Sequence, residues 1–249
     1  MIGRFKYDNE VFEGVVKGER VVVGRGLYCD TFFLSELEIM PPTNPSKIIC
    51  VGLNYMDHAR ELDIEIPKEP LIFLKPPSSL LGHLGKIVYN SMAKRVEYEA
   101  ELAVVVGKRC KNVQCKDSRN VIMGYTCFND VTARDLQKKD GQWTRSKSFD
   151  TFAPVGPFIT DQELDICDLS IRTRVNGKVK QDSRTSNLIF GVPELIEFIS
   201  SIMTLEAGDI IATGTPSGVG ELSVGDEVEI EIEGIGILKN SVVSDRYQI

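Results

Sequence analysis

The sequence lacks the features that mark secreted, membrane-spanning and nucleic-acid-binding proteins. Its six cysteines are dispersed and include no Cys-x-x-Cys pair, which is typical of reduced thiols in a cytosolic protein. No apolar run approaches the roughly 20 residues that a transmembrane helix needs. The net charge of −7 argues against a basic surface for nucleic acid. We therefore expect a cytoplasmic protein that contacts neither a membrane nor nucleic acid.

The order of apolar and turn-forming residues predicts two domains of unequal size. The N-terminus has no apolar segment of the kind found in a secretory signal. Two short predicted strands come first, and the run Pro41-Pro42-Thr43-Asn44-Pro45 then prevents a helix or central strand from continuing. We therefore predict a small β-rich N-terminal domain over residues 1–44 and a larger domain over residues 45–249.

One stretch, residues 95–107, combines alternating acids with a continuous apolar run. Side chains of a strand alternate between two faces, so Glu97, Glu99 and Glu101 are predicted to share one face. The Ala-Val-Val-Val run that follows indicates that the strand enters the protein interior. Unpaired carboxylates are costly there, and a hard divalent cation with oxygen ligands would relieve their repulsion. The alternative is a solvated edge strand, which acid alternation alone would favour.

The chain has only two histidines, and one of them lies close to an acid. Residues 56–62 have helical character, so His58 and Glu61, at positions i and i+3, are predicted to face the same way. A histidine beside a carboxylate is a candidate general base, and an incidental surface pair is the alternative. His83 has no such partner and is predicted to lie in a loop.

Other polar positions follow or interrupt the predicted strands. Lys75 ends one strand, where it can reach an anionic ligand or remain solvated. Asp130 follows the predicted strand 121–129, where it can cap the next helix or serve as a third carboxylate beside the glutamates. The glycine-rich loop 214–220 can hold a carboxylate with its backbone N–H groups, with a bare turn as the alternative. The alternating acids of residues 227–233 precede no apolar run and indicate a solvated sheet face.

Six short motifs then occur in order along the larger predicted domain. They are Ile49-Cys50-Val51-Gly52-Leu53-Asn54-Tyr55-x-x-His58-Ala59-x-Glu61, Phe73-Leu74-Lys75-Pro76, Glu99-x-Glu101-Leu102-Ala103-Val104-Val105, Asn129-Asp130-Val131-Thr132-Ala133-Arg134-Asp135-Leu136-Gln137, Ser146-Lys147-Ser148-Phe149-Asp150 and Thr213-Gly214-Thr215-Pro216-x-Gly218-Val219-Gly220. Each motif alone is weak. The six in this order resemble the fumarylacetoacetate hydrolase family, from about residue 45 to the C-terminus.

The resemblance carries expectations about fold, assembly and metal. It implies an α+β, β-rich fold, a mixed β-sandwich roll of the fumarylacetoacetate hydrolase type with a small N-terminal β-rich domain. It also implies a homodimer. The expected cofactor is Mg²⁺ or Mn²⁺, with Ca²⁺ as a substitute in crystals, held by Glu99, Glu101 and Asp130. Glu97 lies outside the matching motif.

The resemblance also assigns roles to single residues. His58 and Glu61 match the water-activating pair of the acylpyruvate-hydrolase-like branch, which lies on a short lid over the ligand. Lys147 matches the active-site lysine of the family. The candidate substrate contacts are Lys75, Arg134, Gln137 and Thr215.

These parts support more than one reaction of a small 2-oxo acid. The leading interpretation is hydrolysis of an acylpyruvate C–C bond or oxaloacetate-type decarboxylation, through a metal-stabilised enolate of pyruvate. The alternative is a 2-hydroxyhepta-2,4-diene-1,7-dioate isomerase or decarboxylase of aromatic-acid catabolism. That reaction favours a second basic pocket, for which Arg134, Arg145 and Arg184 are candidates. A non-catalytic metal-binding protein is a remote alternative, because every motif position is intact.

Overall fold

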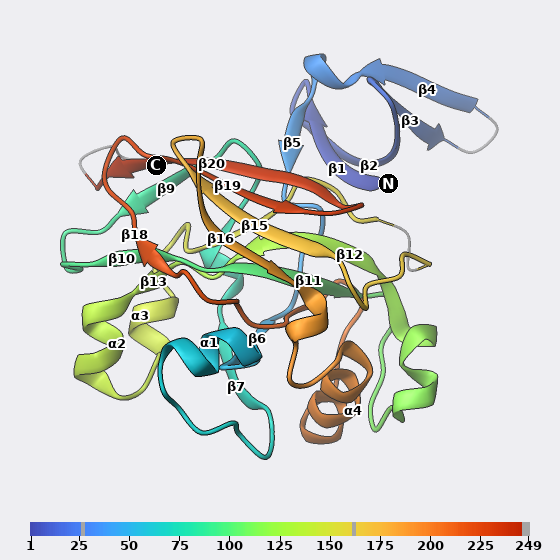
Figure 1. Ribbon diagram of the computed structural model, residues 1–249. Helices are drawn as coiled ribbons and strands as arrows, with labels where there is room; N and C mark the ends of the chain where they lie inside the picture. The colour runs from blue at the N-terminus through green and yellow to red at the C-terminus, as the bar shows by residue number, and fades with distance from the viewer. Residues whose placement is uncertain (26–27, 161–162, 246–249) are drawn as a thin grey trace.

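The computed structural model describes residues 1–25, 28–160 and 163–245. Over these residues the chain is α+β and rich in strands, with four β-sheets and short helices around them (Figure 1). None of the described helices has the length and apolar character that crossing a membrane would require. Two of these sheets together position the candidate site.

The N-terminal sheet stands apart at the upper right of Figure 1. Its core is a small cluster around Phe5, Val21 and Leu37, which Phe158 of the main body completes. The antiparallel strand order is β4 (Tyr28–Phe33), β3 (Arg20–Arg25), β2 (Glu10–Lys17), β1 (Ile2–Tyr7) and β5 (Glu38–Met40). All five strands lie within the predicted β-rich N-terminal segment. The domain boundary at residue 44 itself stays a prediction.

A mixed seven-stranded sheet forms the centre of the molecule. Its order is β7 (Leu71–Lys75), β6 (Ile48–Gly52), β17 (Ile210–Ala212), β11 (Ala100–Val106), β12 (Ile122–Asn129), β14 (Ala153–Gly156) and β8 (Leu80–Leu81). Strand β11 is buried along its whole length, because Leu102 and Val104 pack in one hydrophobic cluster and Ala103 packs in another. The predicted entry of the apolar run into the interior is confirmed.

A five-stranded sheet packs over one face of the central sheet and gives the sandwich its second layer (Figure 1). Its order is β16 (Lys178–Arg184), β15 (Ser170–Val175), β19 (Glu227–Ile232), β20 (Gly236–Ser244) and β9 (Lys86–Tyr89). The β15–β16 hairpin turns at Asn176 and Gly177, both with positive φ, as a type I′ turn requires. In β19 the apolar side chains face the core and the glutamates face outward, as the alternation predicts.

A three-stranded sheet corrects the prediction of one continuous acidic strand. Its order is β13 (Thr132–Ala133), β10 (Val96–Tyr98) and β18 (Gly220–Glu221). The chain leaves this sheet at Glu99 and enters the central sheet as β11. The break arises because β10 pairs with β13 and β18, whereas β11 pairs with β12 and β17. Glu97 and Glu101 therefore belong to different sheets.

Short helices connect the strands and border the sheets. The α-helices are α1 (Met56–Glu61), α2 (Arg134–Asp140), α3 (Thr144–Lys147) and α4 (Val192–Ile202). The 3₁₀-helices are η1 (Leu34–Glu36), η2 (Pro77–Ser79), η3 (Cys115–Val121) and η4 (Thr185–Asn187). One apolar face of α4 packs into the core through Leu195, Ile196 and Ile199, whereas Ile202 is exposed.

Gly124 in β12 offers a test of how closely this sheet is covered. A β-carbon there would lie 1.8 Å from the carbonyl oxygen of Thr160, and backbone cannot yield as a flexible side chain can. We expect Gly124→Ala to lower the free energy of unfolding in urea by about 1–3 kcal/mol. Gly24→Ala in β3 is the matched control, because its β-carbon would meet no heavy atom within 4 Å. Equal unfolding midpoints for the two variants would contradict this packing.

Candidate active site

Three carboxylates meet where β11 begins and β12 ends. Glu99 directly precedes β11, Glu101 is its second residue, and Asp130 directly follows β12. The antiparallel register pairs Ala100 with Asn129, which brings Asp130 beside Glu99. One oxygen from each of Glu99, Glu101 and Asp130 lies within 4.8 Å of the others, and all three side chains are buried. We call these three residues the carboxylate cluster.

Cationic side chains contact two members of the cluster. The Nζ of Lys147 donates to Glu99 Oε2 at 2.9 Å and to Asp130 Oδ2 at 2.5 Å. Arg134 makes a second ion pair with Glu99, and Lys75 makes a second one with Asp130. Burial lowers the pKa of Lys147, but the facing carboxylates of Asp130 and Glu99 outweigh it and the pKa rises. Lys147 is therefore held as a buried ammonium.

Glu101 differs from its two neighbours because no described residue forms an ion pair with it. Its Oε2 accepts the backbone N–H of Gly214 at 2.9 Å. Burial, and then the charges of Asp130 and Glu99, raise the pKa of Glu101 well above its usual value. Burial also raises the pKa of Glu99, yet Lys147 and Arg134 together bring it down to about 2.

The cluster therefore has the donor chemistry and the charge that suit a hard divalent cation. Three buried carboxylate oxygens within 4.8 Å of one another match the oxygen ligands that Mg²⁺ and Mn²⁺ prefer. Burial, and then the charges of Asp130 and Glu99, disfavour the ionised form of Glu101, which has no ion-pair partner among the described residues. A divalent cation held by Glu99, Glu101 and Asp130 would give Glu101 a positive partner.

Lys75, a candidate substrate contact from the sequence, is committed to the protein. Its side chain is fully buried, and its Nζ pairs with Asp130 and donates to the carbonyl oxygens of Val131 at 3.1 Å and Phe152 at 2.5 Å. An ammonium group has three N–H donors, and three acceptors occupy them here. Lys75 also does not border the site cavity described below. Its contacts hold Asp130 in place.

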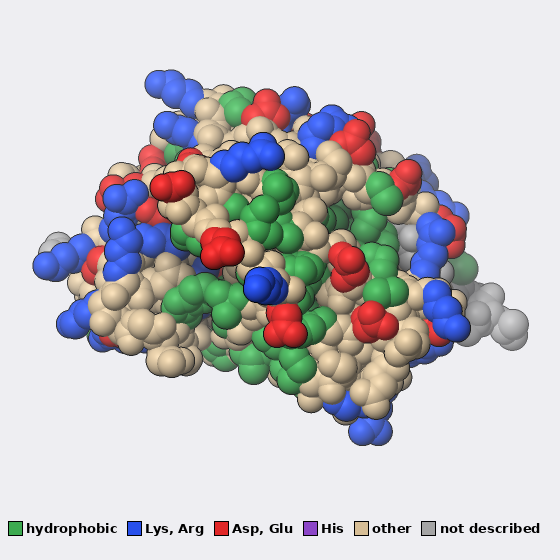
Figure 2. Space-filling model, turned by 60° about the horizontal axis from the view of Figure 1, so that its bottom comes forward, with side chains coloured by type: hydrophobic (Ala, Val, Ile, Leu, Met, Phe, Trp, Pro, Cys, Tyr) green, Lys and Arg blue, Asp and Glu red, His purple; other side chains and the backbone are tan. Residues whose placement is uncertain are grey.

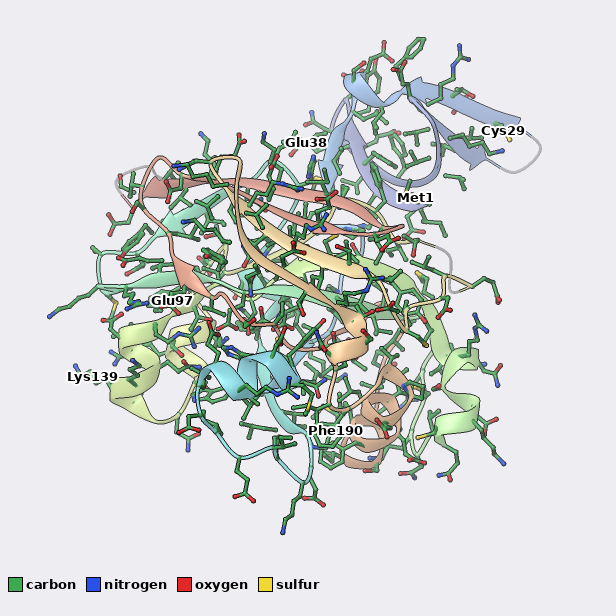
Figure 3. All side chains as sticks on the ribbon, in the orientation of Figure 1. Met1, Cys29, Glu38, Glu97, Lys139 and Phe190 are labelled. Atoms are coloured by element: carbon green, nitrogen blue, oxygen red, sulfur yellow. The ribbon has the colours of Figure 1, made fainter. Side chains whose placement is uncertain are left out.

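Arg134 forms the centre of a separate network beside the cluster. It donates from Nε to Glu97 Oε2 at 2.5 Å and from Nη1 to Gln137 Oε1 at 2.6 Å, in addition to its pair with Glu99. Glu97 lies between β10 and α2 in Figure 3 and also accepts from Arg95 at 2.5 Å. Glu97 thus orients Arg134 and is not a member of the carboxylate cluster.

A cavity of about 310 Å³ opens above the carboxylate cluster. Its polar border includes His58, Arg134, Gln137, Lys147 and Thr215 along with the three carboxylates. Its apolar side is formed by Leu62, Ile64, Leu71, Phe73 and Trp143. In Figure 2 the bottom of the molecule, as seen in Figure 1, is turned toward the viewer, and hydrophobic side chains gather across this face. The cavity thus places an ionic surface opposite an apolar one, within a volume that suits a small organic acid.

His58 borders this cavity and forms a hydrogen-bonded pair with Glu61 on α1. The Nδ1 of His58 lies 3.0 Å from Glu61 Oε2, as the i, i+3 spacing predicts. Ala59 is the single buried residue of α1, so packing contributes little to holding the helix. Hydrogen bonds from neighbouring segments hold it instead. Asp57 accepts from Ser183 Oγ at 2.6 Å, and the amide of Asn54 bonds both backbone groups of Phe190, which Figure 3 labels near α1.

The family model for the C-terminal domain of fumarylacetoacetate (FAA) hydrolase matches residues 47–243 of this chain. The chain belongs to the fumarylacetoacetate hydrolase family. The solved structure of 5-carboxymethyl-2-hydroxymuconate delta-isomerase from Mycobacterium smegmatis superposes with a TM-score of 0.90, at 42% identity, covering 98% of both chains. The sandwich, the N-terminal sheet and the order of the motifs are therefore those of a family fold.

Two other proteins that are similar to this chain have names that state an activity. The mitochondrial oxaloacetate tautomerase Fahd2a of Rattus norvegicus is 43% identical over 82% of this chain and 69% of its own length. The maleylpyruvate hydrolase from Sphingobium sp. SYK-6, solved with manganese(II) ion and pyruvate, has a TM-score of 0.83 at 29% identity, covering 98% of both chains. These relatives are enzymes, and a manganese ion accompanies the last of them.

The arginines proposed for a second basic pocket do not gather at the cavity. Arg145 pairs with Asp140 and Arg184 pairs with Asp168, both on the surface. Neither borders the cavity, whereas Arg134 does. Arg134 in turn is held by Glu97, Glu99 and Gln137, so the described residues present no separate basic pocket for a distant carboxylate.

The surroundings of Glu101 predict that its carboxylate contributes strongly to cation affinity. Glu101→Gln removes one anionic oxygen ligand, and we expect it to weaken Mg²⁺ or Mn²⁺ binding by at least about 100-fold, since outer-shell partners alone are worth about 10–100-fold. Isothermal titration calorimetry measures the affinity. Glu229→Gln in the outward-facing row of β19 is the control and should bind the cation as the parent protein does. Unchanged affinity in Glu101→Gln would place the cation elsewhere.

The buried position of Lys75 predicts a role in stability. Lys75→Met keeps the aliphatic stem but leaves Asp130 with one ion-pair partner fewer in the interior. We expect the free energy of unfolding, measured in urea without divalent cations, to fall by about 3 kcal/mol. Lys6→Met breaks the exposed pair with Glu38 and should have little effect. Similar small losses in the two variants would show that Lys75 is dispensable.

Proposed function

We propose that this chain is a divalent-cation-dependent enzyme that interconverts the keto and enol forms of a small 2-oxo acid such as oxaloacetate. The carrying observation is that His58, which Glu61 contacts at 3.0 Å, borders the same cavity as the carboxylate cluster. Relatives named as an oxaloacetate tautomerase and a delta-isomerase, each more than 40% identical, support proton transfer. A tautomerase and a delta-isomerase both move a proton and break no C–C bond.

Glu99, Glu101 and Asp130 would hold the cation. When bound, a divalent cation neutralises the carboxylate of a 2-oxo acid and polarises its adjacent carbonyl, which favours the enolate. Lys147 adds a fixed positive charge beside two of these carboxylates. Gln137 and Thr215 border the same space and can orient a carboxylate or carbonyl by hydrogen bonds.

His58 is the proton carrier in this proposal. Its Nδ1 donates to Glu61 when the ring is neutral, which leaves Nε2 with the lone pair. Nε2 takes a proton from the carbon next to the 2-oxo group, and the imidazolium that forms then gives this proton to the enolate oxygen. The reverse transfer regenerates the keto acid. Glu61 fixes the tautomer of the ring and stabilises the imidazolium that forms.

Hydrolysis of an acylpyruvate C–C bond is the second candidate function. The His58–Glu61 pair also favours it, because the same Nε2 can take a proton from water, and a water nucleophile needs a base. The relative named maleylpyruvate hydrolase supports this reading at lower identity. The relative named as a delta-isomerase supports an ene-dioate isomerase, but Arg145 and Arg184, the candidates for its second basic pocket, do not border the cavity. The homodimer expected from the family stays a prediction.

A substrate panel distinguishes the two candidates. Oxaloacetate, acetylpyruvate and fumarylpyruvate are each offered with Mg²⁺ and again with excess EDTA, and enol absorbance and C–C cleavage are followed separately. We expect EDTA-sensitive tautomerisation of oxaloacetate. His58→Ala should lower kcat by about 100-fold or more while cation affinity is retained. His83→Ala is the matched control, since His83 Nδ1 accepts the backbone N–H of Lys239 away from the site.

Three outcomes of the panel would change the proposal. Faster cleavage of acetylpyruvate or fumarylpyruvate than tautomerisation of oxaloacetate would select the hydrolase. Turnover that survives EDTA would remove the cation from the mechanism. Equal loss of cation affinity and kcat in His58→Ala would make His58 a structural residue.

A further inference from the structure

One loop contacts both halves of the candidate site. The 214–220 loop donates the N–H of Gly214 to Glu101 Oε2 at 2.9 Å. Four residues later the N–H of Gly218 donates to Glu61, at 3.1 Å from Oε1 and 3.3 Å from Oε2. Glu61 in turn meets His58 Nδ1 at 3.0 Å. The loop therefore joins a carboxylate of the cluster to the carboxylate that orients the histidine.

Gln181 of β16 fixes the near end of this loop to the carboxylate-bearing strand. Its side chain is 1% exposed and makes four hydrogen bonds. Oε1 accepts the N–H of Ala100 at 3.0 Å and the hydroxyl of Thr173 at 2.6 Å. Nε2 donates to Thr215 Oγ1 and to the carbonyl of Pro216, both at 2.9 Å. Because Ala100 lies between Glu99 and Glu101, one amide sets the spacing between the carboxylate cluster and the loop.

Tyr98 of β10 fixes the far end of the loop. Its hydroxyl donates to the carbonyl of Gly218 at 3.1 Å, and its ring is 3% exposed. Gly218 has a φ of +90°, and a β-carbon there would lie 2.4 Å from the carbonyl of Lys180. A β-carbon at Gly220 would in turn lie 2.5 Å from the Tyr98 hydroxyl. The backbone at the Glu61 contact is thus confined from two sides.

We infer that the 214–220 loop positions the His58–Glu61 pair relative to the carboxylate cluster, with Gln181 and Tyr98 as the positioning residues that hold the loop. The reaction assigned to His58 rests on the proposed function, but the placement of the pair does not. Gln181 and Tyr98 do not border the cavity, and their side-chain hydrogen bonds go to neither His58 nor Glu61. They act through the backbone of the loop.

The exposure of the pair explains why such positioning is needed. The side chain of Glu61 is 42% exposed, so packing does not set its orientation. Water competes for both its oxygens, and a fixed backbone N–H favours the rotamer that faces His58. That rotamer keeps the proton on Nδ1 and the lone pair on Nε2. Loosening the loop should therefore mix the two neutral tautomers of His58.

Nitrogen-15 NMR of the imidazole rings tests this inference directly, since the chain has only two histidines. His83→Ala assigns the His58 signals. We expect the parent protein to show the Nδ1–H tautomer, and Tyr98→Phe to move both ring shifts toward the mixed-tautomer average. Cation affinity should stay unchanged in Tyr98→Phe, and kcat on the substrate found active should fall about 10-fold with little change in KM.

Gln181→Met should act both on the near end of the loop and on β11, since it removes the bonds to Thr215, Pro216 and Ala100. We expect the same shift of the His58 signals together with about 10-fold weaker cation binding. Tyr125→Phe, at a buried tyrosine of β12, is the control and should leave every readout unchanged. If Gln181→Met fails to fold, Tyr98→Phe carries the test alone.

The outcomes separate this inference from the proposed function. Unaltered His58 shifts in Tyr98→Phe would overturn the inference, whatever the protein turns over. Shifts altered equally in Tyr98→Phe and Tyr125→Phe would also overturn it, because general loosening of the core would then be the cause. Absence of turnover in the parent protein, with the tautomer change in Tyr98→Phe intact, would overturn the proposed function and leave the positioning role standing.

Discussion

The mutual repulsion of three buried carboxylates is the constraint around which this structure is arranged. An isolated buried charge is too costly to keep, so each carboxylate needs compensation. Glu99 receives Arg134 and Lys147, and Asp130 receives Lys75 and Lys147. Glu101 receives one backbone N–H and no ion pair among the described residues. The compensation is therefore uneven, and a divalent cation would complete it at the point where the neighbouring side chains do not.

The pattern of the acids indicated only part of this cluster, and the family resemblance supplied the rest. The alternation and apolar run at residues 95–107 placed Glu97, Glu99 and Glu101 on one face, whereas the exclusion of Glu97 and the inclusion of Asp130 came from the resemblance. The i, i+3 spacing correctly paired His58 with Glu61. The change of sheet at Glu99 was missed, because it depends on which strands pair with each half. Lys75 reaches Asp130 from β7, three strands away from β11 in the sheet, and no local period records such a contact. Gln181 lies in a strand of polar residues, and nothing in that composition distinguishes it.

The two halves of the site are held by different kinds of interaction. The carboxylate cluster lies at the start of β11 and the end of β12, and β11 is buried on both faces, so the positions of these carboxylates depend on the packing of the core. The His58–Glu61 pair lies on a six-residue helix with one buried side chain, and side-chain hydrogen bonds to loops hold it. The positions of the carboxylates can vary little without unfolding the sandwich. The His58–Glu61 pair can move with small changes in the segments that contact α1.

This difference explains how relatives with one family fold can be named as a tautomerase, an isomerase and a hydrolase. Each of these reactions can use an enolate beside a carboxylate, and a cation held by the carboxylate cluster would stabilise it. The reactions differ in which atom exchanges a proton with the base, and a displacement of about 1 Å can change a rate by about 100-fold. The 214–220 loop contacts both Glu101 and Glu61, so its conformation affects the distance between the carboxylate cluster and the His58–Glu61 pair. Selection for a new reaction would therefore act first on residues that hold this loop, and the carboxylate cluster could remain as it is.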